Sequence, residues 1–561
     1  MKINRYFAAS VSVLAVATIA SVASGACAHE IYLPYHWGTR PPKPIMPHMH
    51  GHWAPFVAPK ANASGTWTDV SNVPFKSEGG WGPLVLTDGS VMIKQAFTGT
   101  AGQWYKLTPD IKGNYTDGTW TALASMPAGY SPDFFAEQVL TDGRVLIEGG
   151  EYNGGSADWT NKGALYDPVQ NSWTSVTAPS GWSTIGDAES IILPNGTYML
   201  ANCCDNPGKQ ALASISGTTV TWTAGNSYNY NDEEGYASLP GGNVLMVDVW
   251  NHGSNYDDYE IYNTSAGTWS LAGHTADYLS STSTFELGAA SLTPQYGSKG
   301  TIIQFTANAS PGINDVYDVA GGTWTSGPVT KVGSTVYYYA DAPAATLPDG
   351  NILTEGSPGY GATPAHFWEF NINTSGVVTA TQVNDTNTSG SSSNFTGNLI
   401  PLPTGQILWD NSQYSTEVAV YTPQGSANPS WLPVVSSVSS TLDVGSTGNA
   451  ISGTNFNGFD LGGAYGDDAQ AATNFPLVRI TNNGTGDVCF ARSYNFSTMG
   501  VWTSGTTNAV FDIPKTCESG ASSLQVIVNG LASAGTNVTL QTNQKHLVCV
   551  HIGHAIVCHL E

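Results

Sequence analysis

The stretch Ala136-Glu137-Gln138-Val139-Leu140-Thr141-Asp142-Gly143-Arg144-Val145-Leu146-Ile147 decides the fold of this chain. Two apolar runs flank the tetrapeptide that starts at Leu140, and such runs joined by an Asp-Gly turn predict a β-hairpin. The Leu-x-x-Gly turn recurs at Leu86, Leu193, Leu239, Leu347 and Leu402, with a looser copy at Leu292. The chain is therefore predicted to repeat one small β unit along most of its length.

A second marker repeats out of phase with the turns. It is a tryptophan followed by Thr or Ser, at Trp67, Trp120, Trp173, Trp222, Trp269 and Trp324. A spacing of about 50 residues, without helical periodicity, is typical of four-stranded propeller blades of the kelch type. Seven turn copies predict an all-β protein with a seven-bladed kelch-type β-propeller over residues 64–430. We expect the tryptophans to pack between blades.

The remaining sequence predicts four further segments. Residues 1–28 have the charged start, apolar run and small-residue end of a signal peptide. Residues 29–63 are rich in Pro and His and are expected to run along the surface. Residues 431–540 predict an immunoglobulin-like β-sandwich. Residues 541–561 form a tail that contains Cys and His. The protein is thus expected to be secreted or periplasmic, with no integral membrane segment after signal cleavage.

Composition excludes some partners and allows others. Only 11% of the 561 residues are charged. The chain has 42 Asp and Glu but only 18 Lys and Arg, which gives a net charge of −24. Such a field repels phosphate backbones and anionic lipid, so no nucleic-acid partner is expected. A neutral ligand, such as a glycan, binds through hydrogen bonds and aromatic faces and is compatible with this charge.

With these motifs the chain resembles the galactose oxidase-like group of secreted kelch propellers. The resemblance is carried by Ala128-Gly129-Tyr130 leading to Leu140-Thr141-Asp142-Gly143, and by Pro476-Leu477-Val478-Arg479-Ile480 in the sandwich. It covers nearly the whole mature chain and is more specific for fold than for function. Oxidases of that group hold one copper with two tyrosines, two histidines and a cysteine cross-linked to a tyrosine.

The copper ligands of that group are not retained where the resemblance would place them. The Tyr-His pair would fall in 337–341, Tyr-Tyr-Tyr-Ala-Asp, and the second histidine near 493–496, Ser-Tyr-Asn-Phe. The first-blade cysteine is replaced by the stretch 79–83, Gly-Gly-Trp-Gly-Pro. Copper needs imidazole with thiolate or phenolate ligands. Copper is therefore the least favoured cofactor, and a copper radical oxidase the least favoured activity.

Acidic residues recur at one phase of the repeat. Six residues before each turn leucine stand Gly80, Phe134, Asp187, Glu233, Glu286, Asp341 and Thr396. Four consecutive blades thus carry a carboxylate where the innermost strand begins, and aligned positions in a closed ring should converge. Convergent carboxylates need a cation or shared protons to neutralise them.

Three interpretations of this carboxylate ring stay open. The ring could bind a hard cation such as calcium. It could bind a sugar and act on it, with one carboxyl as acid and another as base. It could also be structural, with the side chains capping turns. The predicted catalytic residues are Asp187, Glu233, Glu286 and Asp341, and the predicted substrate-binding residues are the nearby aromatics Trp81, Phe134, Tyr236 and Tyr339.

Cysteine and histidine positions suggest further sites. Cys489 and Cys517 are the most natural disulfide in an oxidising compartment. Cys203 and Cys204 could bond to each other, bond elsewhere or stay reduced, and Cys549 and Cys558 could staple a hairpin in the tail. The tract His48-Met49-His50-Gly51-His52 and the tail histidines offer metal donors without a standard zinc spacing.

The sequence favours a secreted propeller that binds a neutral glycan through the carboxylate ring and, if it is an enzyme, cleaves it by carboxyl acid/base chemistry. The alternative is a non-catalytic surface interaction or matrix protein. No nucleophile elbow, P-loop, dinucleotide fingerprint or HExxH pair is present. Substrate identity, turnover and oligomeric state are not predicted.

Overall fold

The computed structural model describes residues 65–76, 78–99, 102–203, 208–226, 234–280, 286–412, 415–466 and 468–542, together with the backbone of 547–552 and 555–560. Strands dominate these residues, and the helical elements among them are the short 3-10 turns η1 (Ser389–Ser391), η2 (Asn394–Thr396) and η3 (Pro429–Trp431). None of the described helices is long and apolar enough to cross a membrane. The predicted signal peptide and the segment 29–63 lie outside the described residues.

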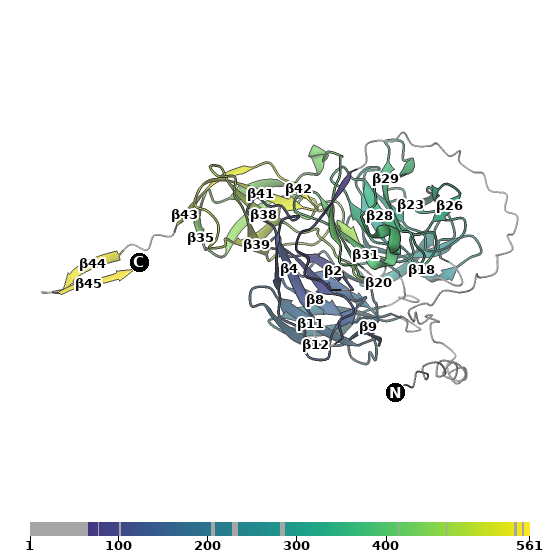
Figure 1. Cartoon of the computed structure of the whole chain (residues 1–561), viewed down its shortest axis with the longest axis horizontal. Helices are drawn as coiled ribbons and strands as arrows, with labels where there is room; N and C mark the ends of the chain where they lie inside the picture. Colours follow the sequence, from purple (N-terminus) through teal and green to yellow (C-terminus); the bar gives the residue numbers. More distant parts are fainter. Residues whose placement is uncertain are drawn as a thin grey trace, which may run out of the picture.

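The first three sheets are antiparallel and each is built from four strands close in sequence (Figure 1). The first contains β2 (Gly80–Val85), β3 (Val91–Gln95), β4 (Trp104–Thr108) and β5 (Thr119–Ala122). The second contains β7 (Ala136–Val139), β8 (Val145–Glu148), β11 (Lys162–Asp167) and β12 (Ser172–Thr177). The third contains β13 (Ser190–Ile192), β14 (Tyr198–Ala201), β15 (Gln210–Ser216) and β16 (Thr219–Ala224).

The next three sheets repeat the same order of strands. The fourth contains β17 (Ala237–Ser238), β18 (Val244–His252), β19 (Asp257–Asn263) and β20 (Thr268–His274). The fifth contains β21 (Ala290–Thr293), β22 (Thr301–Gln304), β23 (Asp315–Asp318) and β24 (Thr323–Ser326). The sixth contains β27 (Ala344–Thr346), β28 (Ile352–Gly356), β29 (His366–Ile372) and β30 (Val378–Gln382), to which β37 (Gly463–Ala464) adds a fifth strand.

The seventh sheet joins the two ends of the repeat region. It contains β31 (Gly397–Pro401), β32 (Ile407–Asn411) and β33 (Val418–Thr422), and its outer strand is β1 (Thr66–Asp69) from the start of the described chain. Inner strands contact their neighbours from β31 to β2, β7 and β13, and from β17 to β21, β27 and β31. Smaller pairings involve β6 (Pro132–Asp133), β9 (Tyr152–Asn153), β10 (Ser156–Ala157), β25 (Thr330–Val332) and β26 (Thr335–Tyr337).

The C-terminal region pairs into one nine-stranded assembly beside the repeats (Figure 1). Its strands are β34 (Val434–Val438), β35 (Thr441–Val444), β36 (Asn449–Thr454), β38 (Leu477–Asn482), β39 (Val488–Tyr494), β40 (Thr507–Asp512), β41 (Gly520–Val528), β42 (Leu531–Ala532) and β43 (Thr536–Thr542). All pairs are antiparallel except β35 with β43. We refer to residues 434–542 as the C-terminal domain.

The Leu-x-x-Gly turns form the hairpins predicted from the sequence. In the second sheet, the Gly143 amide donates to the Leu140 carbonyl oxygen at 2.9 Å, and the Leu140 amide donates to the Arg144 carbonyl oxygen at 2.8 Å. Gly143 has a φ of +81°, a conformation that glycine adopts without steric cost. The same bonds occur at the other five regular copies, while the looser copy at Leu292 has a longer connection, 294–300, between its strands. These turns define one face of the repeat region, the turn face.

The marker tryptophans pack between sheets, as predicted. The Trp173 indole nitrogen donates to the Ala124 carbonyl oxygen of the preceding repeat at 2.9 Å, and Trp120 and Trp222 make equivalent bonds to Ser71 and Thr177. Trp67 on β1 donates to the Asn384 carbonyl oxygen at 2.7 Å. These four bonds each tie an outer strand to the preceding repeat, and the bond from β1 ties the last sheet to the one before it. The Trp269 and Trp324 indole nitrogens have no hydrogen-bond partner among the described residues.

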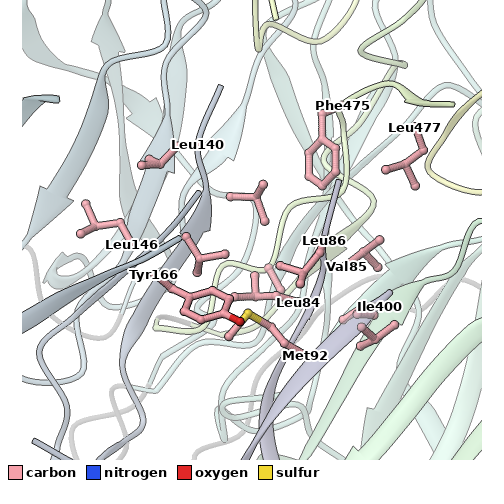
Figure 2. Packing of buried hydrophobic residues seen from close by; sticks show 14 of the residues in the cluster. Leu84, Val85, Leu86, Met92, Leu140, Leu146, Tyr166, Ile400, Phe475 and Leu477 are labelled. Carbon is pink, nitrogen blue, oxygen red and sulfur yellow. The ribbon is translucent and has the colours of Figure 1, made fainter. Parts of the chain in front are cut away.

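The C-terminal domain docks on the turn face. The Ser493 amide donates to the Thr87 carbonyl oxygen at 3.1 Å, and an Arg492 guanidinium nitrogen donates to the Asp142 carbonyl oxygen at 2.8 Å. One apolar cluster continues from the first, second, third and seventh sheets into this domain, and Figure 2 labels Leu86, Leu140 and Ile400 together with Phe475 and Leu477 as members of it. The repeats and the C-terminal domain therefore share a core.

The cysteine predictions are partly resolved. Cys489 and Cys517 form the predicted disulfide. Cys203 is disulfide-bonded, which excludes a free thiol, while Cys204 lies outside the described residues. The tail forms the predicted hairpin, β44 (Leu547–Ile552) with β45 (Ala555–Leu560), and the backbone register sets Cys549 opposite Cys558.

Candidate functional site

The carboxylates of the predicted ring stand where inner strands begin, at the face opposite the turns, which we call the strand-start face. Asp187 precedes β13, Glu286 precedes β21 and Asp341 precedes β27; Glu233 lies outside the described residues. The Asp187 and Glu286 side chains are 6% and 8% exposed, and Asp341 is half-buried. Their catalytic roles stay predictions, because position and burial alone do not assign chemistry.

A segment of the C-terminal domain reaches this face. Its strand β37 pairs with β27, Ala464 opposite Ala344. A Cβ on Gly466 would lie 2.4 Å from the Leu287 carbonyl oxygen and 2.8 Å from the Asp341 Cα atom. Gly466 therefore fits, without a side chain, between the strand starts that carry Glu286 and Asp341.

The same segment touches several other repeats. The Tyr465 hydroxyl donates to the Phe395 carbonyl oxygen at 2.6 Å, ahead of β31. The Gln138 side-chain amide donates to the Gln470 carbonyl oxygen at 2.7 Å and to the Ser190 carbonyl oxygen at 3.0 Å. The described residues of this stretch, 463–466 and 468–470, form the insert segment, which is thus held by the second, sixth and seventh sheets.

Sequence reasoning missed the insert segment. It brings Asp468, which is fully buried, to a face where Glu189 and Glu234 are also fully buried. A signal was present, because residues 462–468, Gly-Gly-Ala-Tyr-Gly-Asp-Asp, interrupt the strand pattern with glycines and two acids. A glycine-rich break inside a strand-rich domain indicates close backbone approach, but nothing in the sequence gives its destination.

An aromatic cluster lies on the other side of the strand-start face, on the first and second sheets. The Phe134 ring lies with its centroid 4.4 Å from that of Trp81 and 6.0 Å from that of Tyr152. Phe97 packs on both Phe134 and Tyr152, and Tyr465 of the insert segment packs on Trp81 at 5.1 Å. Phe97, Phe134 and Tyr152 keep part of their rings exposed, while Trp81 is fully buried.

A buried ion pair anchors this aromatic cluster. The Lys94 ammonium lies 2.8 Å from the Asp133 carboxylate, with both side chains almost fully buried, and the Phe97 amide donates to the same oxygen at 3.0 Å. Burial raises the pKa of Asp133, although the Lys94 charge and these bonds oppose the rise. The pair ties the segments that carry Phe97 and Phe134 to each other.

The Tyr152 hydroxyl of the aromatic cluster is affected by the charge of Asp187, a residue of the carboxylate ring. Burial raises the pKa of this hydroxyl, and the charges of Glu151, Asp187 and Asp133 raise it further. The phenol therefore stays protonated as a hydrogen-bond donor beside carboxylates. Ring position Asp187 and the aromatic cluster thus belong to one neighbourhood.

Two predicted ligand contacts are packed into the protein interior. Tyr339 is fully buried against Phe305, and its hydroxyl donates to the Thr330 hydroxyl oxygen at 2.8 Å. Tyr236 is 1% exposed, and the pKa of its hydroxyl is raised by burial and then by the charge of Glu189. Their roles as substrate-binding residues stay predictions, with Phe134 the most accessible of the four aromatics.

Backbone strain concentrates at the strand-start face. Nine described residues other than glycine have a positive φ, and five of these are asparagines. The other four are Phe97 (+46°), Phe134 (+53°), Asp341 (+49°) and Trp502 (+55°). A left-handed conformation costs a bulky side chain about 1–3 kcal/mol. Two of these four residues are predicted site residues, and Phe97 packs on one of them.

The donors at this face do not fit a copper radical centre. Residues 493–496, where the resemblance would place a histidine, lie at the turn face, since the Phe496 amide donates to the Thr141 carbonyl oxygen at 3.2 Å. The segment that reaches the strand starts contains no histidine. His252, His274 and His366 contact the tyrosines Tyr278, Tyr256 and Tyr337. Three described positions of the ring, Asp187, Glu286 and Asp341, carry carboxylates rather than imidazole or phenolate. The absence of copper stays a prediction.

Comparison with known proteins supports the repeat interpretation. No protein-family model matches the chain. Over 146 residues it is 30% identical to the Kelch-like protein terF of Aspergillus terreus (strain NIH 2624 / FGSC A1156), which covers 25% of this chain and 29% of that protein. The chain is related to kelch-like proteins. With its repeated four-stranded sheets it has a kelch-type β-propeller fold, although it matches less than a third of that relative.

Two solved structures are also similar. One is described as a novel fungal alcohol oxidase with catalytic diversity among the AA5 family, in complex with copper; it has a TM-score of 0.47 and 13% identity, over 85% of this chain and 100% of that chain. The other, YCF48 bound to D1 peptide, has a TM-score of 0.41 and 13% identity, over 65% of this chain and 96% of that chain. At TM-scores below 0.5, neither likeness carries an argument about the site of this kelch-like chain.

Proposed function

We propose that this chain is an exported seven-bladed kelch propeller with an immunoglobulin-like C-terminal domain, and that it binds a neutral glycan at the strand-start face. The seven sheets would be the blades, closed by β1 on the seventh sheet. The Cys489–Cys517 disulfide is consistent with an oxidising compartment. The ring carboxylates and the aromatic cluster would together form the binding site.

The strain at Phe97, Phe134 and Asp341 carries this proposal. Strained conformations persist where the surroundings over-determine them, and they cluster at ligand sites. Here the strain holds partly exposed rings and a half-buried carboxylate at the same face. Aromatic faces can stack on a sugar ring, and carboxylate oxygens accept hydrogen bonds from its hydroxyl groups. The two kinds of group are complementary to a polyhydroxylated neutral ligand.

Binding is tested with a panel of neutral oligosaccharides and the purified full chain, by calorimetry. Phe134→Ala and Asp187→Asn should each weaken the best ligand at least about tenfold, because each removes roughly 1.4 kcal/mol or more of binding energy. Asp167→Asn, at the end of β11, is the matched control and should bind as the parent does. Unchanged affinity in both site variants would remove the strand-start face from the proposal.

Cleavage is tested separately from binding. If the ring also acts as acid and base, release of reducing ends should be lost in Asp341→Asn and in Glu286→Gln. Binding without release would leave a lectin-like protein. A chain that binds no glycan would favour the alternative function, a surface interaction or matrix protein.

A further inference from the structure

A groove lies at the two outer strands of the seventh sheet, outside the inner strands that carry the carboxylate ring. Its volume is about 600 Å³, a size typical of small-ligand sites. It is bordered by the end of β1 and the residues that follow, by the residues before η1, and by the residues that lead into β33. None of its lining residues belongs to the ring or to the aromatic cluster, so the groove is a separate feature of the molecule.

Two carboxylates line this groove, and one asparagine is hydrogen-bonded to both. The Asn387 side-chain amide donates to the two Asp69 carboxylate oxygens at 3.2 and 3.0 Å, and its backbone amide donates to Glu417 Oε1 at 3.0 Å. The Thr388 hydroxyl donates to the other Glu417 oxygen. These bonds bring the two carboxylates into one site and fix their orientation in the groove wall.

The donors that hold these carboxylates carry no charge. No Lys, Arg or His of the described residues forms an ion pair with Asp69 or Glu417. An ionised carboxylate offers about four lone-pair sites, so each of the two can accept further hydrogen bonds. The chain as a whole has a net charge of −24, which attracts cations to its surface. The groove is therefore electrostatically complementary to a cationic ligand.

Valine side chains form the apolar part of the groove lining. Val70 and Val418 are buried, Val73 is half-buried, and the Val70 amide donates to the Val418 carbonyl oxygen at 2.8 Å. No group of three or more His, Cys, Asp or Glu side chains that could hold a metal ion occurs in the described part of the chain. Valines beside carboxylates instead match an ammonium group on an alkyl chain, because burial favours the methylenes while the head donates three hydrogen bonds.

We propose that this groove binds a primary alkylammonium group, with its ammonium head on Asp69 and Glu417 and its alkyl chain along the valines. Free polyamines carry such a group, and so do the lysine side chains of other proteins. The bound ligand contacts β1, the residues before η1 and the start of β33 together. The site does not depend on what ligand the strand-start face takes.

The test is calorimetric titration of the full chain with pentylammonium at fixed ionic strength. Pentanol, which has no charge, should not bind, and methylammonium should bind at least about threefold more weakly because it lacks the other methylenes. Glu417→Gln and Asp69→Asn keep the shape of each side chain and should each lower the pentylammonium affinity at least about threefold. Equal affinity for pentylammonium and methylammonium would overturn the proposal, since it would show attraction to charge without the valine contacts.

Two further ligands distinguish the sources of the ammonium group. Diaminopentane represents a free polyamine, and N-acetyl-lysinamide represents a lysine side chain of a partner protein. Tighter binding of the diamine would assign the groove to polyamines, and tighter binding of the lysine derivative would assign it to a partner. The proposal is overturned if neither ligand displaces pentylammonium.

Glu518→Gln is the matched control. Glu518 is exposed and accepts a hydrogen bond from the Thr485 hydroxyl at 2.5 Å, but it lies in the C-terminal domain and does not line the groove. This variant should bind pentylammonium as the parent does, and so should Phe134→Ala, which affects the proposed glycan site alone. Equal losses in Glu417→Gln and Glu518→Gln would overturn the proposal, because they would reflect only the general attraction of an acidic chain for cations. A parent that binds no pentylammonium would overturn it as well.

Discussion

The turn face and the strand-start face are built from the same repeat but differ in what they bury. At the turn face the six regular hairpins share their hydrogen bonds, and glycine occupies every left-handed position of those turns. At the strand-start face the repeats differ from one another. Acids there are buried, as at Glu189, Glu355 and Asp410, whereas Asp142 in a turn is 36% exposed. The turn positions that all repeats share thus build the fold. The strand-start positions that differ between repeats are where we expect a binding or catalytic site.

Buried acids should make stability depend strongly on pH, and Asp315 at the start of β23 gives the largest expected effect. Its carboxyl is fully buried and accepts hydrogen bonds from the Ala276 and Asp277 amides at 2.6 and 3.0 Å. Burial, with the nearby Asp277 charge, raises its pKa from 3.8 to about 8. The folded protein therefore keeps a proton that the unfolded chain loses near pH 4.

Stability should fall as pH rises through this window, because the folded state binds more protons than the unfolded state between the two pKa values. The loss is about 1.4 kcal/mol per pH unit for one group, or on the order of 5 kcal/mol between pH 4 and 8. Asp315→Asn should flatten that slope in urea unfolding followed at several pH values. Exposed Asp117→Asn should leave it unchanged, and an equal slope in both variants would contradict the assignment.

A smaller loss is expected at the turn face from Gly89→Ala. Gly89 has a φ of +75°, and an added Cβ would lie 2.5 Å from the Phe490 ring of the C-terminal domain. Strain and collision together should cost about 2–3 kcal/mol in denaturant unfolding. Gly217→Ala is the control, because φ is +56° there and nothing lies within 4 Å of its added Cβ. A similar cost in both would show that backbone strain alone decides, and that docking adds nothing.

The difference between the turn face and the strand-start face also explains which features the sequence could predict. The hairpin at Leu140 and the inter-sheet place of Trp173 follow from local turn chemistry and from a period, so both were predicted and are confirmed. Asp187 and Asp341 were located by the same period. The insert segment around Gly466 could not be, because its place depends on a contact between residues distant in sequence.

The smallest stability change should come from Asp341→Asn at the strand-start face. Asn has the shape of Asp and tolerates a positive φ better than most residues. The free energy of unfolding should therefore change by no more than about 0.5 kcal/mol in either direction. Glycan affinity should fall if the carboxylate contacts the ligand. If Asp341→Asn lowers glycan affinity without lowering stability, the strained residue serves ligand binding and not the fold. A loss as large as that of Gly89→Ala would instead make Asp341 a structural residue, and the two faces would no longer differ in what their strained positions do.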